Sequence, residues 1–356
     1  MESIMPSDPT KLQKTKDIGI PSIAMCVARV PNSGRLIFGS SDFKLHEIDV
    51  FAEKPQPMPF GGEGHQSYVT GVVLTAPNIA VSGSYDGQLI WWDVENREPT
   101  RKVKAHELWI RRLVISPDGK TIASVADDMQ CKLWNADTGE MLRQFSDHKP
   151  ITPHDFPSML HAVTFSADGK FLATGDKVGH VAIWETTSGS KVGMVEAPGL
   201  YTWDSKQRRH SIGGIRALAF SPDSKLIAVG GIGQIGNIDH LDAPARIEIF
   251  DWQKGERKHE LNNDKFKALV EDLAFDPSGQ WLLSSGGAGD GFVTFTNVET
   301  GKPIHQDKLP MHVHQLALNE SHDMLFAVGH HKIVVSEFKV SEPASTTAEP
   351  EKGGGK

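Results

Sequence analysis

The stretch Ile115-Ser116-Pro117-Asp118-Gly119-Lys120 separates two short apolar segments and recurs along the chain in recognisable copies. Proline presets the first backbone angle of a tight turn, and glycine accepts the positive angle that the turn requires, so the stretch predicts a hairpin between two strands. Three clear copies occupy residues 165–170, 220–225 and 275–280, and three weaker copies occupy residues 31–35, 76–78 and 319–322.

The spacing of these turns predicts a repeat architecture. From Pro77 onward, successive turns lie 40 to 55 residues apart, and the shortest interval matches the roughly 40–45 residues of one four-stranded propeller blade. Two more strand-like segments follow each turn, as residues 79–82 and 88–93 do around the hairpin signal Tyr85-Asp86-Gly87. The chain contains seven such units, so we expect an all-β fold: a single seven-bladed β-propeller of four-stranded antiparallel blades.

Two of the units carry a set of polar residues that resembles the WD-repeat (WD40) family, and the resemblance extends over about residues 14 to 340. The family links a histidine, a serine or threonine, an aspartate and a tryptophan; the matching residues are His65, Ser82, Asp86 and Trp92 in the second unit, and His106, Ser124, Asp128 and Trp134 in the third. The resemblance implies that these residues form a structural network, in which a carboxylate and a hydroxyl satisfy a buried imidazole and the indole fills the gap beside it. Val178 stands where the fourth unit would have the aspartate, and Phe250 replaces the tryptophan in the fifth, so we expect weaker networks there.

The last unit supplies only three strands, whereas a propeller blade needs four. Because residues 13–20 are not used by the first unit, we expect them to form the outer strand of the last blade and so to remove an open sheet edge. The resulting organisation is a flexible N-terminus (1–12), a propeller (13–340) and a disordered C-terminal tail (341–356) rich in Pro, Thr, Glu and Gly.

Composition narrows the class of protein. A formal net charge of −8 argues against general affinity for nucleic acid. Cys26 and Cys131 each lie in an apolar, strand-like run, so we expect buried free thiols, which fit a reducing compartment. The chain contains no apolar stretch of the length of a secretory signal or a membrane span. We therefore expect a cytoplasmic protein without a membrane partner, monomeric outside its complex.

Three insertions are expected on one face of the ring. In WD-repeat geometry, the loop that enters each blade and the loop between its second and third strands share one face, which we call the top face. The extended segments 146–158, 196–210 and 230–242 fall in these loop classes, so we expect them to adjoin one another. The second insertion combines side chains that are enriched at binding hot spots, namely Tyr201, Trp203, Arg208 and Arg209. The alternative is that the aromatic residues pack down to hold a long loop in place.

A second group of candidate residues comes from aligning the first strands of the seven units. This alignment puts Arg111 in register with Met25, Thr70, His161, Arg216, Glu271 and His314, and the residues two places earlier include Tyr68, Trp109 and His312. The resemblance implies that these positions surround the mouth of the central channel and meet a partner. The predicted partner-binding residues of this group are Tyr68, Trp109, Arg111, His161, Arg216, Glu271, His312 and His314.

No catalytic motif accompanies the repeats. The sequence lacks a Gly-x-Ser-x-Gly elbow, a P-loop, a Cys-x-x-Cys pair and a His-Glu-x-x-His helix. We therefore predict a non-enzymatic scaffold, without metal or cofactor, that binds a protein or peptide partner on its top face; nucleic acid is an unlikely partner. The alternative is a metal, small-ligand or catalytic site in a channel lined by histidines such as His161, His312 and His314, drawn from sixteen in the chain.

Overall fold

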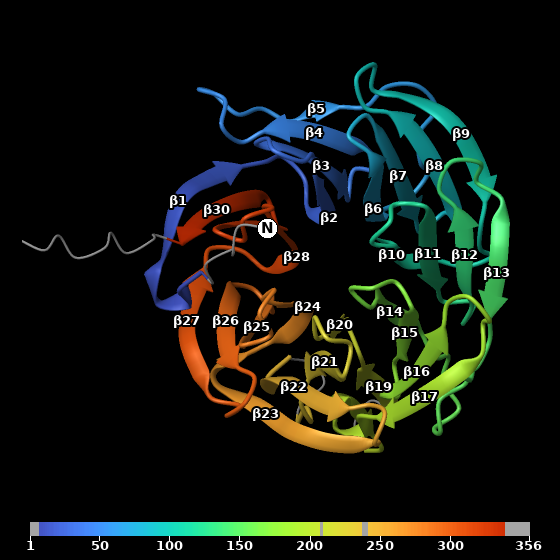
Figure 1. Ribbon diagram of the computed structural model, residues 1–356, viewed down its shortest axis with the longest axis vertical. Helices are drawn as coiled ribbons and strands as arrows, with labels where there is room; N and C mark the ends of the chain where they lie inside the picture. The colour runs from blue at the N-terminus through green and yellow to red at the C-terminus, as the bar shows by residue number, and fades with distance from the viewer. Residues whose placement is uncertain (1–6, 207–208, 237–240, 339–356) are drawn as a thin grey trace, which may run out of the picture.

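The structure is a computed structural model that describes residues 7–206, 209–236 and 241–338. These residues form seven four-stranded antiparallel sheets, arranged as the blades of a ring, and a short separate hairpin of β18 (Tyr201–Asp204) and β19 (His210–Gly213) (Figure 1). The predicted seven-bladed β-propeller is thereby confirmed. Within the described ranges, no helix has the length and apolar character needed to cross a membrane.

In each of the first six blades the strands follow chain order from the centre of the ring outward (Figure 1). Blade one contains β2 (Ala24–Arg29), β3 (Arg35–Ser40), β4 (Leu45–Asp49) and β5 (Met58–Pro59). Blade two contains β6 (Val69–Ala76), β7 (Ile79–Ser84), β8 (Gln88–Asp93) and β9 (Glu98–Lys104). Blade three contains β10 (Ile110–Ile115), β11 (Thr121–Ala126), β12 (Cys131–Asn135) and β13 (Met141–Phe145). Blade four contains β14 (Leu160–Phe165), β15 (Phe171–Asp176), β16 (His180–Glu185) and β17 (Lys191–Glu196). Blade five contains β20 (Ala217–Phe220), β21 (Leu226–Ile232), β22 (Pro244–Asp251) and β23 (Glu256–Lys267). Blade six contains β24 (Leu269–Phe275), β25 (Trp281–Gly287), β26 (Gly291–Asn297) and β27 (Pro303–Leu309). Two short 3-10 helices, η1 (Pro9–Lys11) and η2 (Pro198–Leu200), lie outside the blades.

Blade seven joins the two ends of the propeller. It contains β28 (Val313–Leu318), β29 (Met324–Gly329) and β30 (Lys332–Phe338), and its outer strand is β1 (Leu12–Gly19). The pairing of β1 with β30 runs from Leu12 opposite Phe338 to Gly19 opposite Lys332, which confirms the predicted closure by the N-terminal segment. Residues 1–6 of the predicted flexible N-terminus, and the whole predicted tail 341–356, lie outside the described residues.

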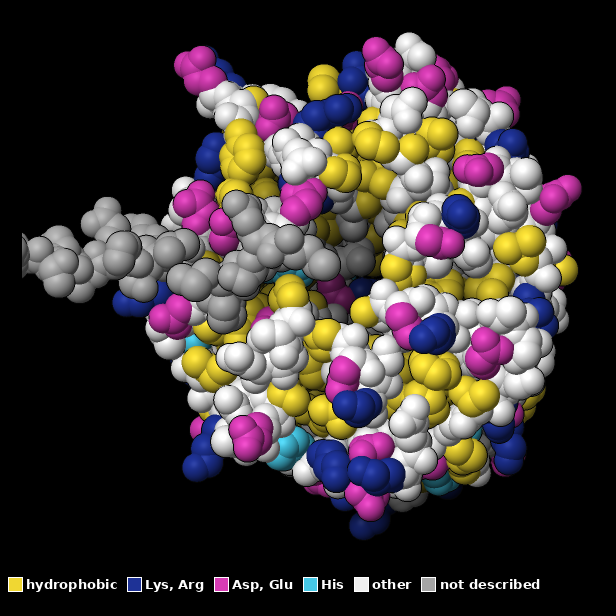
Figure 2. All heavy atoms as spheres, in the orientation of Figure 1, with side chains coloured by type: hydrophobic (Ala, Val, Ile, Leu, Met, Phe, Trp, Pro, Cys, Tyr) yellow, Lys and Arg dark blue, Asp and Glu magenta, His cyan; other side chains and the backbone are white. Residues whose placement is uncertain are grey.

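The hydrophobic core lies between adjacent blades. Ile37 of blade one packs with Val69 and Ile90 of blade two in one buried cluster, and the same arrangement recurs from blade to blade around the ring. Strands buried on both faces need nearly continuous apolar sequence, which is why the inner strands are rich in Val, Ile, Leu and Ala. Cys26 and Cys131 are buried, unpaired thiols within this core. The face of the ring visible in Figure 2 is hollowed at its centre.

Hydrogen-bonded networks fix blades two and three. In blade two, the Trp92 indole donates to the Ser82 hydroxyl at 2.7 Å, and that hydroxyl lies 2.7 Å from His65 Nε2. His65 Nδ1 in turn donates to Asp86 at 3.0 Å. In blade three, the same chain joins Trp134, Ser124, His106 and Asp128 at distances of 2.9, 2.7 and 3.0 Å. Burial lowers the pKa of His106 against the pull of Asp128, so this imidazole is neutral and its network is held by hydrogen bonds.

Blade four has the same network through a different residue, so the expectation of a weaker network there was wrong. His148 Nδ1 donates to Asp176 at 2.9 Å, and His148 Nε2 lies 2.8 Å from the hydroxyl of Thr174, to which Trp184 donates at 3.2 Å. Asp176 precedes Val178 by two residues and is the last residue of β15, where the backbone brings its carboxylate under the imidazole. In blade five, Phe250 is buried, and Trp252 two residues later donates to the Ser224 carbonyl at 2.7 Å.

Candidate binding site at the channel mouth

Irregularities in the innermost strands aim one side chain from each blade into the channel. In six blades the pairing between the first and second strands skips one residue, and a β-bulge of this kind turns the skipped side chain out of the regular alternation. The skipped residues are Met25, Thr70, Arg111, His161, Glu271 and His314. In blade five, Arg216 directly precedes β20. All seven side chains line one cavity of about 220 Å³, so the structure brings together the residues that the strand alignment had put in register.

Arg111 is the best-fixed charged residue of this cavity. Its Nε and Nη2 donate to the two carboxylate oxygens of Asp127 at 2.7 and 2.6 Å, and its Nη1 donates to the Tyr85 hydroxyl at 2.7 Å. Burial opposes the charge of Arg111, but the paired carboxylate of Asp127 outweighs burial and raises the pKa of the guanidinium. A two-pronged ion pair of this geometry holds the guanidinium plane in one orientation.

Four aromatic side chains form a row beside Arg111. Neighbouring ring centroids are separated by 5.5 Å between Phe43 and Tyr68, by 5.7 Å between Tyr68 and Tyr85, and by 4.5 Å between Tyr85 and Trp109. The Arg111 guanidinium lies 4.9 Å from the centre of the Tyr85 ring and 5.1 Å from that of Trp109. Phe43, Tyr68 and Trp109 remain 42%, 42% and 49% exposed. We call Phe43, Tyr68, Tyr85 and Trp109 the aromatic row.

Tyr85 and Phe43 were missed by the sequence reasoning, although a signal for Tyr85 was present. Tyr85 occupies the turn between β7 and β8, directly before the network aspartate Asp86, and its backbone N–H donates to the carbonyl of Tyr68. Asp127 holds the same position before Asp128, and its N–H donates to the carbonyl of Trp109. In blades two and three, the residue before the turn aspartate therefore belongs to the channel mouth, and this could have been inferred from the repeat.

The other side of the mouth carries basic groups that form no salt bridge within the described residues. Arg216 Nη1 lies 3.4 Å from His161 Nδ1, while the buried Arg216 Nε and His161 Nε2 have no hydrogen-bond partner in the described part of the chain. Burial, and then the charge of Arg216, lower the pKa of Lys177, which is nearly inaccessible to solvent. Burial also lowers the pKa of His161 well below its usual value, so this imidazole is neutral beside the two cations.

Glu271 and three histidines occupy the wall where blades six and seven meet. His312 Nε2 lies 3.6 Å from a carboxylate oxygen of Glu271, which is too long for a hydrogen bond. The rings of His312, His314 and His330 are clustered, with centroids 4.7 to 5.0 Å apart. Burial opposes ionisation of Glu271, but His312 and Arg216 lower its pKa to about 2, so it is a carboxylate. Burial lowers the pKa of His314 to about 4 despite Glu271, so this imidazole is neutral.

The three insertions contact one another, which confirms that they adjoin. The ring of His154, from the first insertion, stacks on Trp203 of the second at 4.6 Å, and His154 Nδ1 lies 3.0 Å from the Tyr201 hydroxyl. From the third insertion, Gln234 donates to the Tyr201 carbonyl at 2.7 Å, and the Ile235 N–H donates to the Thr202 hydroxyl at 3.0 Å.

These contacts favour the interpretation that Tyr201 and Trp203 hold the insertions together, because both rings are partly buried against side chains of the same protein. Phe156 of the first insertion also packs on Trp203, with ring centroids 5.3 Å apart. Arg209 is exposed, and Arg208 lies outside the described residues.

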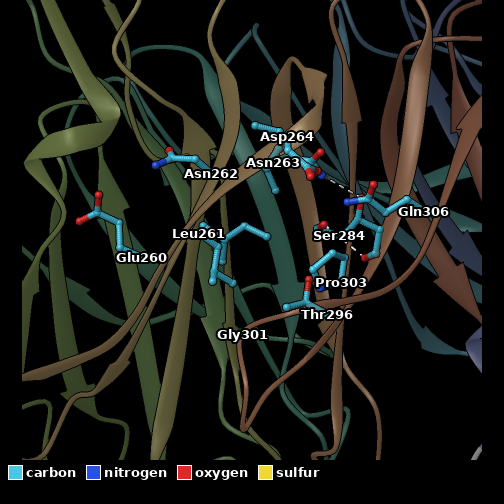
Figure 3. A pocket seen from close by; sticks show the side chains of 14 residues that line it. Glu260, Leu261, Asn262, Asn263, Asp264, Ser284, Thr296, Gly301, Pro303 and Gln306 are labelled. Atoms are coloured by element: carbon cyan, nitrogen blue, oxygen red, sulfur yellow. Dashed lines mark hydrogen bonds between the residues drawn. The ribbon is translucent and has the colours of Figure 1, made fainter.

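A second cavity, between blades five and six, is shown in Figure 3. It has a volume of about 250 Å³, and amide and hydroxyl side chains from β23, β25, β26 and the β27 region contribute much of its lining. Asn263 donates across it to the Thr294 hydroxyl at 3.1 Å. Both cavities are smaller than the roughly 300–1,000 Å³ of typical ligand pockets, but the lining of this one contains no aromatic ring and none of the buried polar atoms that lack a partner in the described residues. The channel mouth is therefore the better candidate for a binding site.

Comparison with known proteins agrees with this architecture. The family model described as "WD domain, G-beta repeat" matches residues 60–93, 97–135, 205–234 and 255–295. Relatives include telomerase protein component 1 of Rattus norvegicus (24% identical over 252 residues, 69% of this chain) and the guanine nucleotide-binding protein subunit beta of Oryza sativa subsp. indica (29% over 133 residues, 36% of this chain).

Apoptotic protease-activating factor 1 of Homo sapiens is a third relative, 28% identical over 170 residues and 47% of this chain. The matched regions cover 8%, 35% and 12% of the lengths of these three relatives, in the order given. The unmatched blades have the same four-stranded form as the matched ones, and blade four repeats the histidine network of blades two and three. The chain therefore belongs to the WD-repeat (WD40) family of β-propeller proteins.

Proposed function

We propose that this propeller is a non-enzymatic platform that captures a protein or peptide partner across its channel mouth, with the aromatic row as the main contact. The observation that carries the proposal is that rings from three successive blades form one continuous row, in which Phe43, Tyr68 and Trp109 are exposed to solvent. Phe43 belongs to blade one, Tyr68 and Tyr85 to blade two, and Trp109 to blade three.

The physical chemistry of the aromatic row supports this role. Binding hot spots are enriched in Trp, Tyr and Arg, and aromatic rings bury a large area with few torsions to restrict. The row is already ordered, because Arg111 is fixed by Asp127 and contacts both Tyr85 and Trp109. A partner therefore gains apolar contact without the entropy loss of ordering the surface first.

The backbone of the turn between β3 and β4 places Phe43 at the end of the row. Phe43 has a φ of +71°, a left-handed conformation that is unfavourable for a bulky side chain. Gly87 and Met129, which also follow a turn aspartate, have φ of +75° and +61°, so this conformation belongs to the turn of the repeat. In blade one this turn presents the Phe43 ring to the aromatic row.

The charges of the mouth indicate part of the partner's chemistry. Arg216 and Lys177 are cationic side chains that form no salt bridge within the described residues, although the charges of Glu271 and Asp127 act on them. A carboxylate of the partner would pair with them, so we expect an acidic side chain beside an apolar segment. The names of two relatives, a subunit of a guanine nucleotide-binding protein and a telomerase component, identify members of assemblies, in keeping with a binding role.

Affinity capture from native extract tests the proposal. The wild-type chain is compared with Tyr68→Ala/Trp109→Ala, which removes two exposed rings of the row, and with a matched control, Met141→Ala/Leu142→Ala. The control residues are each 53% exposed on the outer strand β13. We expect a protein captured by the wild type and by the control but lost with the ring variant. Equal capture by all three folded proteins would contradict binding at the aromatic row.

A further inference from the structure

We propose that Glu271, His312 and His314 form a binding site for a divalent transition-metal ion, with zinc as the best fit. The three residues contribute one carboxylate oxygen and two imidazole nitrogens, and these atoms all lie within 4.8 Å of one another. Glu271 belongs to β24 of blade six, whereas His314 belongs to β28 of blade seven and His312 directly precedes that strand. The site thus spans the junction of two blades.

The spacing of the ligand atoms fits a metal ion better than a hydrogen bond. His312 Nε2 and the Glu271 carboxylate are 3.6 Å apart, which is beyond an ordinary hydrogen bond. Two ligands at about 2.0–2.1 Å from a tetrahedral zinc ion lie about 3.4 Å from each other. The observed separation therefore needs only a small adjustment around an ion.

Unsatisfied nitrogen atoms point to the same site. Within the described residues, Nε2 of His312 and Nε2 of His314 are both buried and lack a hydrogen-bond partner. Buried polar atoms are nearly always satisfied in folded proteins, because leaving one without a partner costs about 1–3 kcal/mol. A metal ion coordinated by the two nitrogen atoms would satisfy both of them at once.

The two imidazole ligands favour zinc over calcium and magnesium. Calcium and magnesium prefer shells of oxygen ligands, whereas imidazole suits zinc and its neighbours in the first transition row. Two histidines and one carboxylate are a ligand set that zinc sites use, with a fourth position left for water or another ligand. Glu271 and His314 line the channel cavity, so that fourth position would open toward the mouth.

Arg216 provides a further test of the proposed metal site, because its positive charge acts on both Glu271 and His314. A cation next to the site weakens the binding of a second cation. Replacing Arg216 by glutamine should therefore strengthen zinc binding, whereas replacing Glu271 by glutamine should weaken it. A merely adventitious surface site elsewhere would respond to neither change.

The test is titration of the full chain, stripped with a chelator, with zinc chloride in a calorimeter. We expect one ion per chain and a melting temperature that rises with zinc concentration, as for any ligand that binds the folded state. Glu271→Gln and His314→Gln should each weaken binding at least about tenfold. The matched control is His305→Gln, which removes another histidine that lies beside a carboxylate, 2.8 Å from Asp307 on β27.

Cobalt(II) provides a second measurement that does not depend on the heat signal. Cobalt bound by two imidazoles and a carboxylate in a four-coordinate site gives visible absorption, which should be lost in Glu271→Gln, a substitution of almost unchanged shape. No zinc binding by the wild type would overturn the proposal. Binding that persists unchanged in a folded Glu271→Gln protein would also overturn it.

Discussion

The rings of Tyr85 and Trp109 are stacked face to face, with centroids 4.5 Å apart and planes inclined by only 5°, although the two residues belong to different blades. Tyr85 directly follows the second strand of blade two, whereas Trp109 directly precedes the first strand of blade three. Their contact joins the two loop classes of the top face, and Arg111 lies against both rings. The exposed surface at the mouth is therefore shared by neighbouring blades.

Deleting residues 1–20 should destabilise the whole ring. The deletion removes β1, uncovers the edge of β30 and exposes apolar residues such as Phe338. A loss of several kcal/mol should lower the melting temperature by on the order of 10 °C. Thermal unfolding followed by circular dichroism measures the change. Lys14→Ala, an exposed substitution within β1, is the control and should melt like the wild type. An unchanged melting curve for the deletion would refute closure by this strand.

Asp176→Ala should destabilise blade four. It leaves the buried His148 Nδ1 without its acceptor, which costs about 1–3 kcal/mol. In blades two and three the carboxylate lies two positions later, so adding Val178→Asp to the same chain should restore part of the loss. Urea unfolding of the single and double variants measures both effects. If the second substitution destabilises the protein further, the two carboxylate positions are not equivalent.

Stability should fall as pH rises through the range set by His180. Glu196 at 2.6 Å raises the pKa of His180 to about 9, against the effect of burial, and Asp147 at 2.8 Å adds to the rise. The folded protein thus keeps a proton that the unfolded chain loses near pH 6.5. The contribution of this group is complete below pH 6.5 and is lost by pH 9.

Urea unfolding measured below pH 6.5, between pH 6.5 and 9, and above pH 9 tests whether the contribution of His180 to stability falls as pH rises. The stability difference between the wild type and His180→Gln should shrink as pH rises, and taking the difference removes the contributions of other groups. A difference that grows with pH would contradict the proposed protonation of His180.

Neither cysteine should react with a thiol reagent while the protein is folded. Burial raises the pKa of the Cys26 thiol to about 12 and raises that of Cys131 as well, so neither forms the reactive thiolate near neutral pH. A colorimetric thiol assay should count two thiols in denaturant and none in the native protein on the same time scale. Rapid labelling of the native chain would mean that the blades open locally.

The fold was predictable because each repeat carries its own turn and strand signals. Ser116-Pro117-Asp118-Gly119 and its copies mark the hairpins, and the missing outer strand of the last blade pointed to the N-terminal segment. The network of blade four was not predicted, because Asp176 reaches His148 from a position two residues before the expected one. The position of this carboxylate depends on the path of the backbone at the end of β15. An alignment of the repeats carries no information about that path.

The channel mouth was predictable only in part, for a related reason. Aligning the first strands selected Arg111 and Glu271, because one bulge recurs at the same place in six blades, and it selected Arg216 directly before β20 of blade five. Phe43 and Tyr85 were missed because their role depends on contact between loops of different blades. Whether Trp203 packs inward was left open, since the position of His154 against its ring depends on how two insertions meet.

The most direct test of the aromatic row is the affinity of the captured partner for single variants, measured by calorimetry. Trp109→Ala should weaken binding about 30-fold, equivalent to about 2 kcal/mol, as expected for a residue at the centre of an interface. Met141→Ala, on the outer strand of the same blade, should change the affinity less than about twofold. Equal affinity of the wild type and a folded Trp109→Ala protein would contradict the central claim that the partner binds at the aromatic row.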